Sequence, residues 1–176
     1  MGFDKAAIVA PEDAERLVGD QNQLRMLTDA STTGGALSSL EVTLSTGSDG
    51  AAPHFHTKSS ELFYVIDGEL QVLADDEIRT VGAGGSIVVP KRMVHAFGAA
   101  PGVAVRVLIV LTPGVERFDY FRLLGRIKDG EATYHDLMAS QDRFDNHFVD
   151  APKWWAERTA GTTERRSLPG TEPSSY

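Results

Sequence analysis

Most of the chain from residue 6 to residue 111 consists of short runs rich in β-branched and aromatic residues, each followed by turn residues. Segments such as STGSDGAAP and GAGG separate the runs, and their Gly, Asp, Pro and Ser residues favour turns. This spacing predicts a β-sandwich or β-barrel. Asp67-Gly68 predicts a hairpin turn between LFYV and LQVLA, because both residue types tolerate positive φ. The runs are AAIVA, QLRML, ALSSLEVTL, ELFYVI, ELQVLA, IRTVG, SIVVP and AVRVLIVL.

The pattern changes after residue 113. Val115, Phe118, Phe121 and Leu124 recur at helical spacing, and EATYHDLMASQDRF offers a second helix. We therefore expect residues 1–114 to form the β-barrel, N-terminal strands included. Residues 115–150 are then a helical extension packed on the barrel.

The last segment, residues 151–176, is mostly polar and contains Gly and Pro. Such a segment has little apolar surface to bury, so it predicts a flexible tail or arm. Trp154 and Trp155 are the exception, and we expect them to anchor the tail to its own or a neighbouring subunit. Removing residues 156–176 is expected to leave the stability of the barrel nearly unchanged.

Composition narrows the function. With 176 residues, 41% hydrophobic and 24% charged, the chain has the composition of one soluble domain with appendages. A net charge of -8 opposes binding to nucleic acid or to an anionic membrane. The chain has no cysteine, which excludes disulfides and thiolate metal sites and suits a cytoplasmic protein. The N-terminal sequence does not resemble a secretory signal, and no run approaches membrane-spanning length.

Most of the candidate metal-binding residues lie in the segment PHFHTKSSELF. Residues i and i+2 of a strand point to the same face, so the His54 and His56 side chains project from one face of the strand. The four residues TKSS are short enough for a hairpin turn, which would bring Glu61 beside the pair. His95 follows a bend at Pro90 and is the natural fourth ligand. Two imidazoles and a carboxylate with open positions are typical of catalytic divalent metals.

The spacing His54-x-His56-x4-Glu61-x6-Gly68, followed by Gly84-x5-Pro90-x4-His95, resembles the two signature motifs of the cupin superfamily. The resemblance implies a mostly β fold, a double-stranded β-helix (jelly-roll) barrel. It also implies that the first motif supplies two histidines and a glutamate to the metal, and the second the last histidine. The chain is most similar to small bacterial single-domain cupins of the quercetinase-like and polyketide-cyclase-like group, in which a helical extension follows the barrel. TPGVERFDYF looks like the join between the two.

Three positions depart from the family motifs. Ser48 stands where the first motif opens with Gly, Arg92 where the second has Gly, and Ala99 where it has Asn. None of them removes a ligand. They leave the turn geometry of the second motif less defined than that of the first.

Several other side chains have two interpretations. We expect His135 and His147 to be surface or packing residues, and the basic pair Lys91 and Arg92 to serve solubility more readily than the binding of an anion. Phe55 and Tyr64 fit packing as well as substrate contact. Strand parity alone does not decide whether the following residues face the barrel or a dimer interface: Phe63, Val65, Phe97, Val105, Val107 and Ile109.

These features predict a metal-dependent enzyme acting on a small oxygen-rich molecule, most simply a dioxygenase, with Glu61 as the catalytic residue. The metal ligands are His54, His56, Glu61 and His95, and the ion is Fe, Mn, Ni, Co or Zn. The alternatives are a redox-neutral cyclase or isomerase and a non-catalytic cupin that binds a small ligand. The expected partners are a small-molecule substrate and a second copy of the chain in a homodimer.

Overall fold

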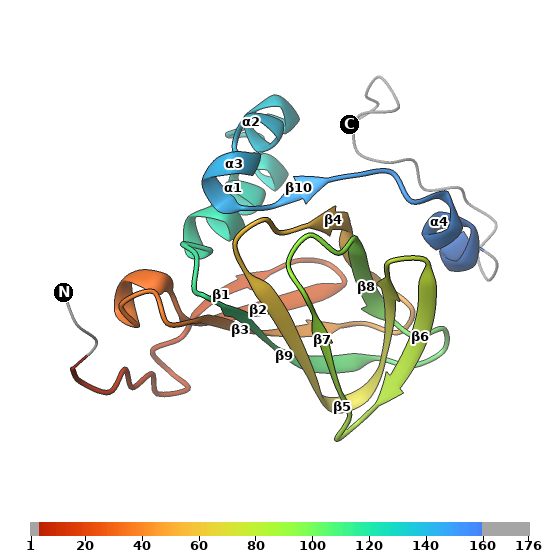
Figure 1. The fold of residues 1–176 in the computed structure, drawn as a ribbon, viewed down its shortest axis with the longest axis horizontal. Helices are drawn as coiled ribbons and strands as arrows, with labels where there is room; N and C mark the ends of the chain where they lie inside the picture. Colours follow the sequence, from red (N-terminus) through yellow and green to blue (C-terminus); the bar gives the residue numbers. More distant parts are fainter. Residues whose placement is uncertain (1–3, 160–176) are drawn as a thin grey trace.

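The computed structural model describes residues 4–159 (Figure 1). Strands dominate this part of the chain, and short helices follow the last long strand. The elements are β1 (Glu15–Val18), β2 (Asn22–Thr28), η1 (Ala30–Thr32), β3 (Ser38–Leu44), β4 (Asp49–Phe55), β5 (Ser60–Ala74), β6 (Glu77–Gly82), β7 (Ser86–Val89), β8 (His95–Ala99), β9 (Val105–Thr112), α1 (Phe118–Lys128), α2 (Tyr134–Ala139), α3 (Gln141–Phe144), β10 (His147–Phe148) and α4 (Pro152–Thr159).

The strands form one strongly curled antiparallel sheet. Its order is β1-β2-β3-β9-β5-β8-β4-β10, and β6 and β7 pair with β5 beside this path. The sheet curls into a half-barrel, with α1, α2 and α3 gathered at one end (Figure 1). The predicted jelly-roll barrel with a C-terminal helical extension is therefore confirmed. The run AAIVA, predicted as a strand, forms no strand, and the first strand begins at Glu15.

Strand β5 holds the barrel together because it pairs with four others. Its first half pairs with β7 and β9, and its second half with β6 and β8. The predicted hairpin at Asp67-Gly68 is wrong, since both residues lie inside this continuous strand. The chain bends there instead: the register to β9 shifts between Val65 and Asp67, and Gly68 has φ 75°. A Cβ atom on Gly68 would lie 1.9 Å from the carbonyl oxygen of Ala104, so the bend requires glycine.

The structure shows which way the six side chains face whose orientation strand parity did not decide. Phe63, Val65, Phe97, Val105, Val107 and Ile109 are all buried in one hydrophobic cluster, together with Leu40, Val42, Leu44, Leu70, Val72, Val89, Ala99 and Leu111. On β9 and the first half of β5 the alternate residues point outward, as the pleat of a strand requires. The predicted dimer-facing alternative therefore does not apply to these six.

The helices form a second, smaller cluster of buried side chains: Tyr120, Leu123, Leu137 and Phe144. The predicted second helix is in fact two short ones, since the chain turns at Ser140 between α2 and α3. A capping box between Thr133 and Asp136 fixes the start of α2. No helix among residues 4–159 is long and apolar enough to cross a lipid bilayer.

Within the segment predicted to be a flexible tail or arm, residues 151–176, Pro152–Thr159 form α4, and residues 160–176 lie outside the described part. Trp154 is 1% exposed and packs on Leu73 and Ala96. The Arg158 guanidinium bonds to Asp49 at 2.9 Å and to the carbonyl oxygen of Ala99 at 2.7 Å. Helix α4 is thus fastened to the barrel beside β6 and β8 (Figure 1).

Candidate metal centre

The four predicted ligand residues come from three strands and lie together. His54 is on β4, His56 follows its last residue, Glu61 is near the start of β5, and His95 begins β8. One ligand atom from each lies within 4.8 Å of the other three. All four side chains are buried, with exposed fractions of 1–4%. Residues far apart in the sequence therefore form one polar group inside the end of an apolar barrel.

Each histidine is oriented by a bond from its outer ring nitrogen. Nδ1 of His54 lies 2.8 Å from the carbonyl oxygen of Ala52, and Nδ1 of His95 lies 3.0 Å from that of Met93. Nδ1 of His56 contacts the carbonyl oxygen of Asp145. A carbonyl oxygen only accepts hydrogen bonds, so each Nδ1 carries the proton and each neutral ring keeps a lone pair on Nε2. This is the way in which metal-binding histidines are usually held.

The inner nitrogens converge on the carboxylate. Oε2 of Glu61 lies 3.2 Å from Nε2 of His56 and 2.7 Å from Nε2 of His95. Burial alone would raise the pKa of Glu61; protons on Nε2 of His56 and His95 would let both rings donate to the carboxylate, and without a metal ion these bonds outweigh burial and hold that pKa well below its usual range. Burial lowers the pKa of His54 well below its ordinary value, so this imidazole stays neutral.

This donor set fits a divalent transition metal. Lone pairs of nitrogen and oxygen repel one another at such distances unless protons or a metal ion lie between them. Three imidazoles and one carboxylate can hold Fe, Mn, Co, Ni or Zn, and the chemistry of the donors does not select one of them.

The loop between the first two ligand strands is not the predicted hairpin. Strand β4 pairs with β8 and β10 and not with β5. The carboxylate of Asp145, from the helical extension, holds the loop instead. It accepts bonds from Thr57 N at 2.8 Å, Thr57 Oγ1 at 2.5 Å, Lys58 N at 2.9 Å and Ser59 N at 3.3 Å.

Asp145 therefore contacts the centre twice, through its side chain on the loop and its backbone carbonyl on His56. It is fully buried, and it has the left-handed backbone conformation, with φ 53° and ψ 45°. Burial alone would raise the pKa of Asp145, but bonds from Thr57 and Lys58 lower it below its usual value. Sequence reasoning missed this residue, because nothing in RFDNHF marks it and its partners lie 86–89 positions earlier.

The turn after Pro90 explains one departure from the family motif. Arg92 has φ 69°, a conformation that glycine adopts without strain and other residues rarely do. Its backbone N–H donates to the carbonyl oxygen of His56 at 2.6 Å, which ties the turn to a ligand residue. The side chains of Lys91 and Arg92 are exposed, in agreement with the solubility interpretation.

Strand β10 and helix α1 cover this end of the barrel. Phe148 pairs with His54, and their ring centroids are 6.5 Å apart. His147, predicted to be a surface or packing residue, is half-buried and stacks on Phe55 at 5.0 Å. His135 is exposed, and so is Tyr64. Arg117, just before α1, is buried, and sequence reasoning did not single it out.

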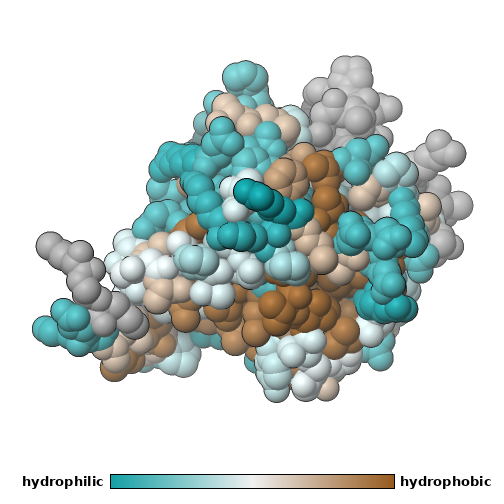
Figure 2. All heavy atoms as spheres, viewed as in Figure 1, coloured by the Kyte–Doolittle hydropathy of each residue, from teal (hydrophilic) through white to brown (hydrophobic). Residues whose placement is uncertain are grey.

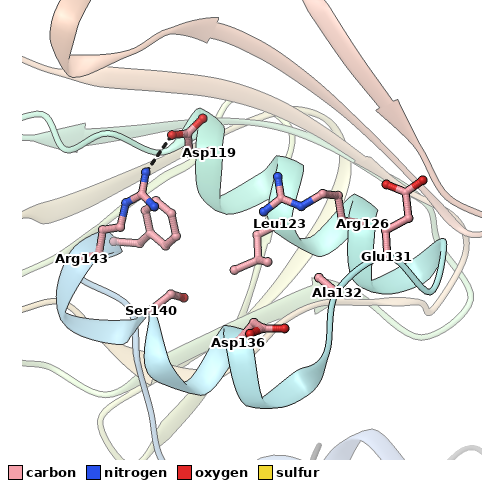
Figure 3. Close-up of a pocket in the computed structure, with 9 residues that line it drawn as sticks. Asp119, Leu123, Arg126, Glu131, Ala132, Asp136, Ser140 and Arg143 are labelled. Atoms are coloured by element: carbon pink, nitrogen blue, oxygen red, sulfur yellow. Dashed lines mark hydrogen bonds and ion pairs between the residues drawn. The ribbon is translucent and has the colours of Figure 1, made fainter.

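A separate groove lies between the helices of the extension (Figure 3). It has a volume of about 460 Å³, and its lining includes Leu123, Arg126 and Phe144. The ion pair between Arg143 and Asp119, 2.9 Å apart, stands at one side of it. None of the four predicted ligand residues lines this groove. The groove is therefore distinct from the His/Glu group, the name used below for the cluster of His54, His56, Glu61 and His95.

Known proteins share this architecture. Residues 40–111 match the family model described as Cupin domain. Among solved structures, KdgF from Halomonas sp. is similar with a TM-score of 0.55 and 20% identity, over 66% of this chain and 99% of KdgF. An RmlC-like cupin from Shewanella frigidimarina has a TM-score of 0.53 and 24% identity, over 66% of this chain and 96% of that protein. The polyketide cyclase RemF from Streptomyces resistomycificus has a TM-score of 0.52 and 23% identity, over 62% of this chain and 80% of RemF. No curated protein matches the sequence. At these identities the likeness establishes the fold.

Proposed function

We propose that this chain, which has the cupin fold and matches the Cupin domain model over residues 40–111, is a metal-dependent enzyme acting on a small oxygen-rich molecule, and specifically a dioxygenase. One observation carries the proposal. Three buried histidines donate Nδ1–H to backbone carbonyls and direct Nε2 toward one buried carboxylate. Such a group costs stability unless a cation occupies it, and its retention is most simply explained by metal chemistry.

The residues that would hold the ion are His54, His56, Glu61 and His95. A bound Fe, Mn, Ni or Co ion would supply open positions where a chelating enediol, flavonol or β-diketone and dioxygen can meet. The chain itself contributes a water-poor surrounding, in which Phe63 lies 6.3 Å from the His95 ring, centroid to centroid. Glu61 is the candidate proton acceptor, because it is the one carboxylate among the four residues of this cluster.

A redox-neutral cyclase or isomerase is the second candidate. Three histidines and a carboxylate suit Zn as well as the redox metals, and Zn would supply Lewis-acid chemistry. The fold likeness to the polyketide cyclase RemF supports this alternative without deciding it, because one cupin site hosts unrelated reactions. A non-catalytic cupin that binds a small ligand is the third candidate.

The first experiment is elemental analysis of the protein as purified, with no metal or chelator added. We expect close to one transition metal ion per chain, and an oxygen-uptake screen with flavonols and β-diketones then separates dioxygenase from cyclase. His56→Ala should lose the metal while the barrel stays folded, and His135→Ala, in an exposed position, is the matched control. A His56→Ala protein that keeps full metal content would refute the assignment of this ligand. Wild-type protein that stays metal-free after reconstitution would favour the non-catalytic candidate.

We also propose that two copies associate through the outer face of β7, β5 and β9. Val88, Leu62 and Val110 lie in one row across these strands, and Val88 is 63% exposed. Tyr64, 43% exposed, stands in the next row. Figure 2 shows hydrophobic side chains gathered over this part of the molecule. An exposed apolar area of this kind on a β-sheet marks an interaction surface, and a homodimer is the commonest partner.

Light scattering coupled to size exclusion tests the dimer. We expect wild-type protein to elute as a dimer and Val88→Lys as a folded monomer, with the circular dichroism spectrum of the wild type. Val18→Lys alters an equally exposed valine on β1, 67% exposed, and should stay dimeric. A monomeric wild type, or a Val88→Lys protein that stays dimeric, would refute this interface.

A further inference from the structure

Arg117 is a buried cation without an acidic partner. Its side chain is 4% exposed, and no carboxylate of residues 4–159 forms an ion pair with it. The guanidinium donates to the carbonyl oxygen of Phe144 at 3.0 Å and, at 3.4 Å, to Oδ1 of Asn146. Its Nε–H has no hydrogen-bond partner among the described residues. A buried, uncompensated charge is costly, so it needs a reason.

The backbone around Arg117 is fixed independently of the guanidinium. The carboxylate of Asp29 accepts the backbone N–H of Arg117 at 2.7 Å and that of Phe118 at 3.2 Å. The carboxylate of Asp145 is occupied by the loop of residues 57–59. Both of these carboxylates therefore hold backbone N–H groups, and neither forms an ion pair with the Arg117 guanidinium.

A buried phenol stands beside the cation. The Arg117 guanidinium lies 4.9 Å from the centroid of the Tyr120 ring. Burial raises the pKa of Tyr120 to about 12, against the lowering effect of Arg117 and with a further increase from the charge of Glu61. The phenol therefore stays protonated and can donate. Its oxygen has one weak contact, with Nδ2 of Asn146 at 3.5 Å, which leaves the O–H free to bond elsewhere.

This pair lies at the end of the barrel that holds the His/Glu group. Asn146, which contacts both side chains, directly follows the residue whose carbonyl oxygen accepts from His56. Two residues later Phe148 pairs with His54. Helix α1 and strand β10 cover the same end of the barrel (Figure 1). The effect of Glu61 on the pKa of Tyr120 is consistent with this proximity.

We propose that Arg117, assisted by the Tyr120 hydroxyl, binds the carboxylate of a small organic acid whose other oxygen atoms face the His/Glu centre. The inference rests on the proposed function in that it describes the substrate of the same site. Guanidinium groups bind carboxylates through two parallel N–H donors, and the free Nε–H supplies one of them. A bound carboxylate would also neutralise the buried charge. A purely structural link between α1 and α3 needs one donor to Phe144 and no positive charge.

The test uses full-length protein stripped of metal and freed of chelator, so that the probe cannot bind through a metal ion. Malonate is the anionic probe and malonamide its neutral counterpart, and binding is measured by calorimetry. We expect wild-type protein to bind malonate at least tenfold more tightly than malonamide. Arg117→Gln, which keeps a donor for Phe144, should lose this preference, and Arg117→Lys should restore part of it. Arg126→Gln, a change on helix α1, which begins directly after Arg117, is the control and should bind as wild type does.

Tyr120→Phe removes only a hydroxyl and serves if Arg117→Gln does not fold. It should weaken malonate binding about three- to tenfold, the loss of one hydrogen bond. Equal malonate affinity in wild type and Arg117→Gln, or no preference for malonate in wild type, would overturn the inference. The metal content of each protein is measured in parallel. Charge-selective malonate binding by a chain that never takes up metal would leave this subsite standing and refute the proposed enzyme.

Discussion

Replacing Asp145 with Asn should weaken both the fold and the metal centre. The carboxylate accepts four hydrogen bonds from Thr57, Lys58 and Ser59. The amide oxygen of Asn can keep the two bonds from Thr57, but its NH2 group would face the N–H groups of Lys58 and Ser59. Two buried donors are then unsatisfied at about 1–3 kcal/mol each, so we expect a loss of about 3 kcal/mol. For a chain of this length, that corresponds to a fall of about 6–12 °C in melting temperature.

The same substitution should lower metal affinity about 10- to 100-fold, the usual effect of removing a group that orients a ligand. Melting is measured by circular dichroism on metal-free protein, and affinity by competition with a chromogenic chelator. Asp142→Asn is the control, because that side chain is fully exposed on α3. A variant Asp145→Asn that melts and binds metal like wild type would show that the extension does not support the centre, and the reasoning would fail.

Three further predictions concern stability. Arg92→Gly should raise the free energy of unfolding by about 0.5–1 kcal/mol in urea titrations, since relief of the φ 69° conformation exceeds the added chain entropy. Lys91→Gly, at a position without positive φ, should lower it. Arg158→Gln should lower the free energy of unfolding by about 2–4 kcal/mol, because the guanidinium joins α4 to the barrel. The exposed control Glu157→Gln should change it little. Removing residues 156–176 should therefore lower the melting temperature, contrary to the expectation from the sequence. The pKa of Asp145 is lowered in the folded state. The ionised carboxylate therefore contributes fully to the folding stability above the unfolded pKa of about 3.9, and this contribution is lost as the pH falls through the folded pKa. The difference in unfolding free energy between wild type and Asp145→Asn should narrow below about pH 4, and a difference that widens would contradict this reasoning.

Local sequence patterns predicted the parts of the site that short-range geometry determines. Strand parity brought His54 and His56 to one wall, and the motif spacing placed Glu61 and His95 with them, as the structure finds. The core side chains followed strand alternation, although parity alone did not decide which face was inward. The helical spacing after residue 113 located α1 correctly.

The wrong predictions and the missed residues have a common physical origin. The Asp67-Gly68 pair suits a tight turn and a strand bend equally well, and only the approach of Ala104 selects the bend. Asp145 and Arg117 are ordinary polar residues in sequence, and their roles come from partners far along the chain. The anchoring of α4 likewise depends on what lies beneath Trp154 and Arg158. Such long-range contacts leave no periodic signal in a single sequence.

The link between Asp145 and His56 also has a consequence for biosynthesis. The two residues are 89 positions apart, so the ribosome makes all four ligand residues long before it makes the group that orients one of them. A nascent chain that ends before residue 145 would expose three histidines and a glutamate on an incompletely supported barrel end. We expect such a chain to hold metal ions loosely and to exchange them with its surroundings. Tight capture then waits until residue 145 has been made and has folded onto the barrel, and the metal available at that stage decides what is bound.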